Sequence, residues 1–289
     1  MPENRRTPVS DCQRAELRAL GAESRWVESE GRRLHVLDYG GEAPPLLVLP
    51  GITSPAITWD FIVAPLRDRV RPLVMDLRGR GLSEAGGSYG APDFAADAAA
   101  AIEQLGLERP LVLGHSLGAR IAAALAARER VELGLTICVD PPLSGPGRGG
   151  YPTPREAFEA QLDAGYAGTT GDEVAASYPL WPRSELLLRA RWVGSCEREA
   201  VLATYDRFAE EDFLEWWAAV PAPAVFVSGG DSPVVTEQGA EEARAANPDA
   251  AYAVVPGAGH MIPWDNLPGF MAELDRALET ELAAGGAGS

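Results

Sequence analysis

The sequence predicts an α/β fold with a mostly parallel, eight-stranded sheet that is flanked by helices. Two observations lead to this prediction. Short apolar runs with strand character alternate along the chain with segments of helical pattern, which is typical of a parallel sheet covered on both faces. The length of 289 residues also suits one sizeable domain, or a core domain that carries an inserted lobe.

Each expected element follows from its local pattern. The first strand has alternating apolar and polar residues, the second ends in Pro-Gly, and Asp93 and Gly106 suit the start and end of the first helix. The expected strands lie at 33–40, 45–51, within 71–81, and at 110–116, 133–140, 223–230 and 250–257. The expected helices lie at 92–107, at 117–129 directly after a strand, and at about 237–246 and 266–283.

Residues 141–220 break this alternation. They begin with the Pro/Gly-rich stretch "PPLSGPGRGGYPTP" and continue as an amphipathic segment rich in Trp, Tyr and Arg. We expect a helical lid, or cap, inserted after strand 6. Its tryptophans are expected to pack the lid against the core rather than to bind a ligand: Trp181, Trp192, Trp216 and Trp217.

The chain therefore divides into four expected parts. Residues 1–24 form a polar, partly helical extension, and residues 284–289 form a disordered tail. The core consists of residues 25–140 and 221–283, and the lid of residues 141–220 lies between these two segments.

Composition excludes several classes of function. The formal net charge of −17 argues against nucleic acid and against anionic membranes as partners, and leaves a small-molecule substrate as the expected partner. All 25 basic residues are arginine, which excludes Schiff-base catalysis by lysine and a Walker-type phosphate loop. The oligomeric state cannot be deduced from these features.

The cysteines and the N-terminus bear on location and cofactors. Cys12, Cys138 and Cys196 are scattered without CxxC spacing, which favours reduced thiols in the cytoplasm. The N-terminus lacks the apolar run of a signal peptide, and no apolar stretch reaches 18 residues. Since the cysteines and histidines do not cluster, we expect no metal and no cofactor.

The segment "VLGHSLGAR" is the strongest chemical signal. It places Ser116 between Gly114 and Gly118, at the end of an apolar strand and the start of an alanine-rich helix. This is the setting of a nucleophile elbow, where glycines permit a sharp turn and the helix N-terminus directs N–H groups at developing negative charge. Ser116 is the predicted nucleophile.

Only three histidines could serve Ser116 as a base. His35 lies inside an early strand, and the side chain of His115 points away from that of its neighbour Ser116. His260 follows the last strand in the Gly-rich loop "VPGAGHMIPWD", at the same sheet edge as the elbow. We therefore predict His260 as the general base and a packing role for His115.

Together these motifs resemble the α/β-hydrolase family over roughly residues 25–283. "LPGITS" is similar to the family's oxyanion loop, with Pro50 in place of a histidine, and "DLRGRGLS" is similar to its D-x-R-G-x-G-x-S segment. The resemblance implies that the backbone N–H groups of Ile52 and Leu117 form the oxyanion hole. It also implies that the "DLRGRGLS" residues brace the loops beside the site.

The acid of the triad has two candidates. The family usually places it after the seventh strand, where "SGGDSPVV" has Ser232 at the expected position and Asp231 one residue earlier. A minority of the family places it after the sixth strand, where this chain has Asp140. An acid at either place could hold the histidine tautomer. We favour Asp140, with Asp231 as the alternative.

A closer resemblance within the family points to the reaction. "LPGITSPAITWDF", "GHSLGAR", "VDPPLSGPGR" and "SPVV" resemble the deformylases of nicotinic acid breakdown, whose acid follows the sixth strand. The resemblance implies a serine hydrolase that cleaves an amide or formamide C–N bond of a small carboxylated substrate such as N-formylmaleamate. A carboxylesterase, a lactonase or a C–C bond hydrolase is the alternative, and a non-enzymatic protein that kept the fold is a third.

A substrate carboxylate would need a cationic anchor. Arginine suits this role because its guanidinium can donate two parallel hydrogen bonds to a carboxylate. The candidates lie on the elbow helix and in the lid: Arg120, Arg148, Arg155, Arg183, Arg189 and Arg191.

Overall fold

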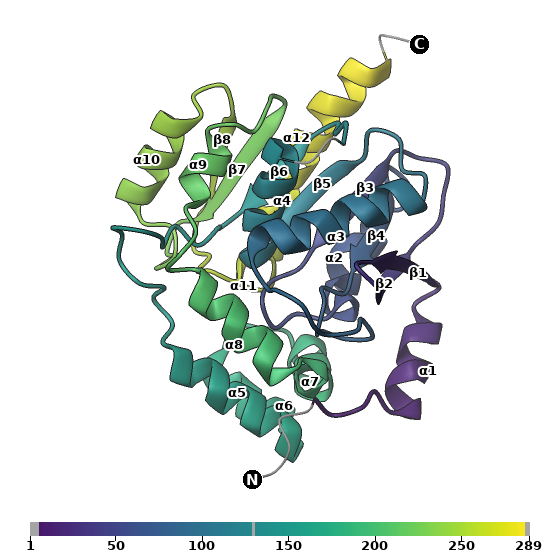
Figure 1. Cartoon of the computed structure of the whole chain (residues 1–289). Coiled ribbons are helices and arrows are strands. Elements are labelled where there is room, and N and C mark those ends of the chain that lie inside the picture. Colours follow the sequence, from purple (N-terminus) through teal and green to yellow (C-terminus); the bar gives the residue numbers. More distant parts are fainter. Residues whose placement is uncertain (1–5, 129–130, 287–289) are drawn as a thin grey trace.

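The computed structural model describes residues 6–128 and 131–286, and its centre is one eight-stranded sheet (Figure 1). The strands follow the order β1-β2-β4-β3-β5-β6-β7-β8 across the sheet. Strands β3 to β8 are parallel, and β2 pairs antiparallel with both β1 and β4. Their bounds are β1 Glu23–Ser29, β2 Arg32–Asp38, β3 Pro45–Leu49, β4 Arg71–Met75, β5 Leu111–His115, β6 Thr136–Val139, β7 Ala224–Gly229 and β8 Ala251–Val255.

The predicted mostly parallel, eight-stranded α/β fold is confirmed. Each of the seven apolar runs contains a strand of the sheet. The pattern search did not locate the eighth, β1, whose sequence ESRWVES is mostly polar and whose residues are largely exposed at the sheet edge. An edge strand has a neighbouring strand on one side only and is more exposed to solvent. It therefore needs fewer apolar residues, and apolar content is a weak signal for it.

Helices cover both faces of the sheet. On one face α3 (Ala91–Gln104) packs on α4 (Leu117–Arg128), which also contacts α9 (Phe213–Trp217), and α9 contacts α10 (Glu237–Ala246). On the other face lie α2 (Asp60–Val63) and α12 (Leu267–Gly286), with α11 (Ile262–Asp265) before it. The sheet residues alternate between the two cores, since Leu47 and Leu49 face the first and Leu46 and Val48 face the second. Short 3₁₀ turns cover Ala56–Trp59, Ala64–Leu66 and Val193–Ser195.

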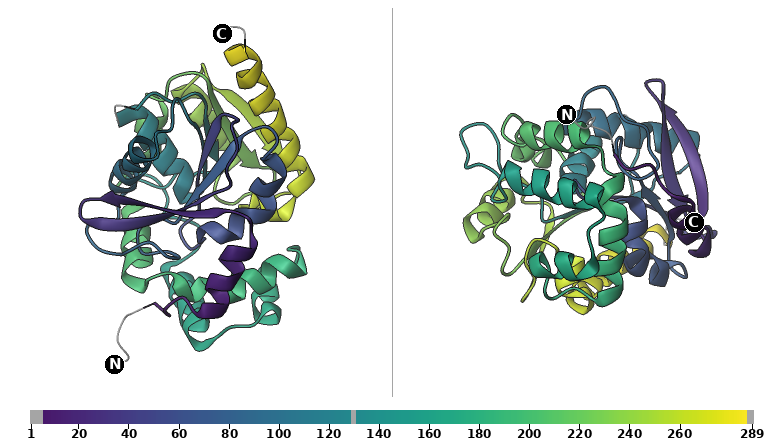
Figure 2. Two further views of the ribbon diagram at one scale, coloured as in Figure 1. Left: turned by 90° about the vertical axis from the view of Figure 1, so that its right-hand side faces the viewer. Right: turned by 90° about the horizontal axis from the view of Figure 1, so that it is seen from below.

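Four helices between β6 and β7 form a layer at one end of the molecule, which we call the cap. They are α5 (Arg155–Ala167), α6 (Gly171–Ser177), α7 (Arg183–Trp192) and α8 (Arg198–Arg207). Seen from below, these helices lie together across that end (Figure 2, right). The remaining helix of the inserted segment, α9, belongs to the core layer, because Trp217 packs on Phe226 of β7. The segment 141–220, which we expected to form a lid, therefore contains both the four cap helices and a helix of the core layer.

Helices lie near both ends of the described chain. Helix α1 (Asp11–Ala19) begins with a capping box of Ser10 and Gln13, and Gln13 also donates to the Arg191 carbonyl of α7 at 2.8 Å. Residues 284–286, which we expected in a disordered tail, continue α12, and 287–289 lie outside the described residues. Among the described helices, none is both long and apolar enough to cross a membrane.

The "DLRGRGLS" segment after β4 braces neighbouring loops. Asp76 accepts hydrogen bonds from His35 Nδ1 at 2.8 Å, from the Ala56 N–H at 2.6 Å and from the Leu82 N–H at 3.0 Å. His35 is therefore held as a buried structural group. Arg80 Nε donates to the Ile52 carbonyl at 3.0 Å and so fixes the loop that follows β3.

Arg78 and Asp97 form a buried ion pair in this brace. Arg78 Nε and Nη2 each lie 2.6 Å from an oxygen of Asp97, and neither side chain is exposed. We predict that Asp97→Ala lowers the free energy of unfolding by about 3–5 kcal/mol, because it leaves the guanidinium buried without its counter-charge. Denaturant titration measures this loss.

The matched control removes both charges. The double variant Arg78→Met/Asp97→Leu should recover most of the lost stability, since apolar side chains of similar volume replace the pair. A loss below about 1 kcal/mol in the single variant would contradict the prediction.

Candidate active site

Ser116 stands on a sharp turn between β5 and α4. Its φ is +56°, a left-handed conformation that is rare outside glycine. A Cβ at Gly114 would overlap the backbone of Gly118, and a Cβ at Gly118 would overlap the carbonyl of Leu49. The two glycines are therefore required, because strand, turn and helix pack backbone against backbone. The turn presents the Ser116 hydroxyl to a cavity above the sheet edge.

His260 and Asp140 stand in line with Ser116. His260 Nε2 lies 2.9 Å from Ser116 Oγ, and His260 Nδ1 lies 2.7 Å from Asp140 Oδ2. Asp140 ends β6 with a φ of +47° and is fully buried. Its carboxylate also accepts from the Gly229 N–H at 3.1 Å and from Ser232 Oγ at 2.6 Å. These donors hold the carboxylate behind the imidazole ring.

Asp231, the alternative acid, does not reach His260. Its side chain is exposed, and only its backbone N–H makes a contact inward, with the Ala258 carbonyl at 2.9 Å. The neighbouring Ser232 instead contacts Asp140. Ser232 stands at the position where the family usually has the acid. That position is the sequence feature that could have indicated the contact of Ser232 with Asp140.

His115 packs beneath the site, as expected from its place beside the turn. Its Nε2 donates to the His260 carbonyl at 2.9 Å, and it forms no hydrogen bond with Ser116 among the described residues. Burial lowers the pKa of His115 to about 3, and the neighbouring His260 lowers it further. His115 is therefore neutral and positions the His260 loop.

Two backbone N–H groups near Ser116 have no hydrogen-bond acceptor within the described part of the chain. Ile52 follows β3 and Leu117 begins α4, and neither N–H donates to another group within the described residues. Gly51 packs next to Ser116, because a Cβ at Gly51 would lie 3.6 Å from that of Ser116. The loop after β3 and the start of α4 are thus arranged side by side.

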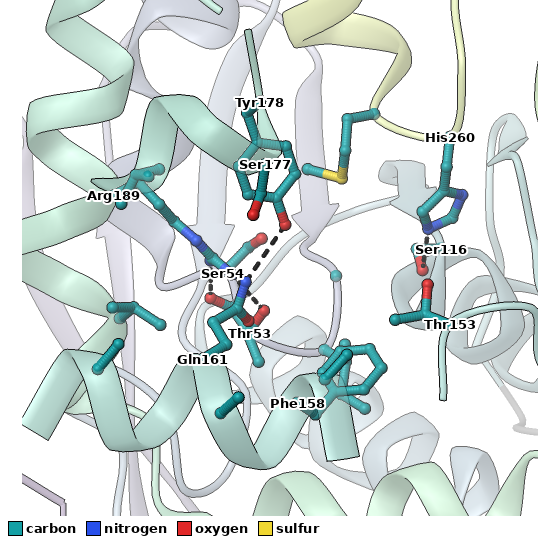
Figure 3. Close-up of a pocket in the computed structure, with 18 of the residues that line it drawn as sticks. Thr53, Ser54, Ser116, Thr153, Phe158, Gln161, Ser177, Tyr178, Arg189 and His260 are labelled. Carbon is teal, nitrogen blue, oxygen red and sulfur yellow. Dashed lines mark hydrogen bonds between the residues drawn. The ribbon is translucent and has the colours of Figure 1, made fainter. Parts of the chain in front are cut away.

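The cavity above Ser116 has a volume of about 610 Å³, and residues of the cap form part of its wall. In Figure 3, Ser116 and His260 lie at one end, while Arg189, Thr53, Gln161 and Tyr178 lie at the other. Tyr151, in the loop before α5, also lines the wall and places its hydroxyl 3.1 Å from His260 Nε2. No sequence motif pointed to Tyr151. Among the described residues, no group of acidic, Cys and His side chains is arranged to hold a metal ion.

Five of the arginines that we considered lie outside the cavity wall. Arg120 is buried but donates to the carbonyls of Pro142 and Glu211, both at 2.7 Å, so it braces the loop after β6. Acidic side chains pair with the remaining four, which are Arg148 with Glu242, Arg155 with Glu159 and Asp206, Arg183 with Asp172, and Arg191 with Glu16. The expectation that these five bind substrate is corrected by their placement.

Arg189 of α7 is the arginine that lines the cavity. It is 5% exposed, its Nη2 donates to Thr53 Oγ1 at 2.6 Å, and its Nη1 donates to the Thr53 carbonyl. No carboxylate of the described residues lies within 4.0 Å of its guanidinium, although Glu185 stands one turn earlier in α7. Beside it in the wall, Gln161 Oε1 is buried without a hydrogen-bond donor among the described residues. Arg189 therefore brings a positive charge without an ion-pair contact to the cavity wall, which also includes the acidic Glu173.

This combination of fold and site is that of an enzyme class. The model of the alpha/beta hydrolase family matches residues 46–274, and the chain belongs to that family. It is a hydrolase.

Its particular relatives narrow the class. The chain is 40% identical over 258 residues to N-formylmaleamate deformylase of Pseudomonas putida, which covers 89% of this chain and 96% of the relative. The crystal structure of N-formylmaleamic acid deformylase from Pseudomonas putida S16 superposes with a TM-score of 0.82 at 37% identity, and covers 86% of this chain and 99% of that one. The chain is also 27% identical over 238 residues to 2-(acetamidomethylene)succinate hydrolase of Mesorhizobium japonicum, which covers 77% of this chain and 83% of that relative.

The neutral state of His115 predicts a pH dependence of stability. Below pH 6.5 the unfolded chain takes up a proton at this imidazole, while the folded protein does so only near pH 3. The free energy of unfolding should therefore fall as pH drops from about 6.5, by up to about 1.4 kcal/mol per pH unit from this residue. Denaturant titrations at pH 7, 6 and 5 measure the slope.

The control for this slope is His115→Gln, which cannot be protonated. Its unfolding free energy should depend less steeply on pH between 5 and 6.5 than that of the native protein. Parallel slopes for the two proteins would contradict a buried, neutral His115.

Proposed function

We propose that this hydrolase cleaves the formamide C–N bond of a small carboxylated substrate, with N-formylmaleamate as the first candidate and formate and maleamate as the products. One observation carries the proposal: His260 lies between Ser116 and Asp140, with Nε2 2.9 Å from Ser116 Oγ and Nδ1 2.7 Å from Asp140 Oδ2. The chain that contains this arrangement is 40% identical to N-formylmaleamate deformylase. The cytoplasm is the compartment that we propose for this reaction.

In the first half of the reaction, Ser116 Oγ attacks the formyl carbon while its proton moves to His260 Nε2. Asp140 accepts the Nδ1–H of His260 and stabilises the imidazolium that forms. The N–H groups of Ile52 and Leu117 donate to the oxyanion, and each such donor typically contributes about 2.7–4 kcal/mol of transition-state stabilisation.

The second half removes the formyl group. The C–N bond breaks, its electron pair stays on nitrogen, and the proton of His260 Nε2 joins that nitrogen. Water then gives a proton to His260 and attacks the formyl-serine, which releases formate and restores Ser116. Every atom that this sequence needs comes from substrate, water and the three side chains.

The far end of the cavity suits the substrate carboxylate. Arg189 has five N–H donors, of which two are used by Thr53. A carboxylate bound there would neutralise a buried charge that otherwise lacks an ion-pair partner. The Gln161 amide nitrogen donates to Tyr178 Oη at 3.2 Å, and its second N–H could donate to this carboxylate. We therefore assign the carboxylate anchor to Arg189, in place of the five arginines outside the wall.

The acid assignment is tested by a matched pair of variants. We predict that Asp140→Asn lowers kcat/KM by about 10³–10⁴-fold, because the amide no longer holds His260 in the productive tautomer. Asp231→Asn should keep the activity within about twofold, since its exposed side chain does not contact His260. Steady-state kinetics on both purified variants measures the difference, and the reverse pattern would overturn the assignment.

The reaction and its anchor are tested together by two substrates. The native protein should release formate from N-formylmaleamate with a kcat/KM well above that for 4-nitrophenyl acetate, and Ser116→Ala should release none. Arg189→Met should lower kcat/KM for N-formylmaleamate about 10- to 100-fold, because it removes charge-assisted hydrogen bonds to the carboxylate. It should leave the neutral ester within about threefold.

Arg191→Met is the control, since Arg191 lies on the same helix and pairs with Glu16 outside the cavity. An equal loss on both substrates in Arg189→Met would assign Arg189 to bracing the Thr53 loop only. Ester cleavage without formate release would favour a carboxylesterase or lactonase instead.

A further inference from the structure

Tyr151 is the cavity residue that the proposed chemistry leaves without a role. Its hydroxyl lies 3.1 Å from His260 Nε2, the same nitrogen that lies 2.9 Å from Ser116 Oγ. A neutral imidazole has one acceptor lone pair on this nitrogen, so one hydroxyl would suffice to satisfy it. The Tyr151 hydroxyl therefore occupies a second site next to Nε2, beside the one that the Ser116 hydroxyl occupies.

The ring of Tyr151 is held firmly in this place. It packs on Phe158, Tyr205 and Phe208 of the cap with ring centroids 5.2–6.2 Å apart, and it meets the His260 ring edge-on at 6.1 Å. Burial raises the pKa of Tyr151, so its hydroxyl keeps its proton and can donate. The cap thus fixes one O–H donor beside the base of the core.

The position around Nε2 has a defined use in the reaction. After Nε2 has taken the proton of Ser116, it must give a proton to the leaving atom, which then stands within about 3 Å of Nε2. Because the Tyr151 hydroxyl lies 3.1 Å from the same Nε2, a leaving atom on its side of the ring can come within hydrogen-bonding distance of it. The oxyanion donors, Ile52 and Leu117, come from other loops of the core.

We propose that Tyr151 is a further catalytic residue, whose hydroxyl donates a hydrogen bond to the leaving-group nitrogen as the C–N bond breaks. The electron pair of that bond stays on nitrogen, the proton of His260 Nε2 joins it, and Tyr151 keeps its own proton. The inference rests on the proposed roles of Ser116 and His260.

The role predicts a dependence on the leaving group. An amide nitrogen departs only with a proton, whereas 4-nitrophenolate departs without one. Tyr151→Phe should therefore lower kcat about tenfold or more for formamide substrates and change it less than twofold for 4-nitrophenyl esters of the same acyl group. Single-turnover measurement of the acylation step makes the comparison direct.

Two controls separate this role from a structural one. Tyr205→Phe removes a hydroxyl from the same aromatic cluster, one that forms no hydrogen bond with His260 among the described residues, and should leave both substrates unchanged. Labelling of Ser116 by a fluorophosphonate, which expels fluoride without a proton, should proceed at the native rate in Tyr151→Phe. Slower labelling to the same degree as the amide loss would show that Tyr151 acts by positioning His260, and would overturn the proposal.

An equal loss on amide and nitrophenyl substrates, or no loss on either, would also overturn it. Failure of the proposed function is recognised separately, because the native protein would then release no formate. In that case a series of esters with alkyl and nitrophenyl leaving groups decides the role of Tyr151, with the alkyl esters expected to lose activity.

Discussion

The site depends on the close approach of three backbone segments at the turn of Ser116. Strand β5 and helix α4 meet with one residue between them, and the start of α4 lies so near the end of β3 that Gly118 has no room for a side chain. This contact brings the loop after β3 next to Ser116, because a Cβ at Gly51 would lie 3.6 Å from that of Ser116. The positive φ of Ser116 is maintained because the sheet and the helix hold both ends of the turn.

Hydrogen bonding and burial determine the electrostatic surroundings of His260. Asp140 accepts hydrogen bonds from Gly229 and Ser232 behind His260, and His115 stays neutral because burial disfavours its charge. The imidazole of His260 thus has a hydrogen-bonded carboxyl group on one side and an uncharged neighbour on the other.

Core and cap divide the work of the site. The core supplies Ser116, His260, Asp140 and the loop after β3, at the carboxyl ends of parallel strands. The cap and the loop before it supply Arg189, Gln161 and Tyr151, which line the remaining wall. Relatives that share the core can therefore differ in substrate through the cap alone, since bond cleavage and substrate choice are carried by separate segments.

Much of the fold, and the candidate residues Ser116, His260 and Asp140, could be predicted because the sequence patterns that indicate them are local. Apolar runs locate seven of the eight strands, and the glycines around Ser116 and His260 mark sharp turns at a strand end. Strand β1 was missed because an edge strand needs few apolar residues, and α9 was assigned to the lid because its packing on Phe226 leaves no local trace.

The sequence by itself determined the fold, the turn that carries Ser116 and the short set of histidines and acids that could serve it. Only the tertiary structure decided between Asp140 and Asp231, and among the arginines. Whether a charge faces a cavity depends on which carboxylates lie within a few ångströms, and those partners can stand far along the chain, 94 residues apart for Arg148 and Glu242. Arg189 is distinguished only by the absence of such a partner among the described residues, and no local pattern encodes that.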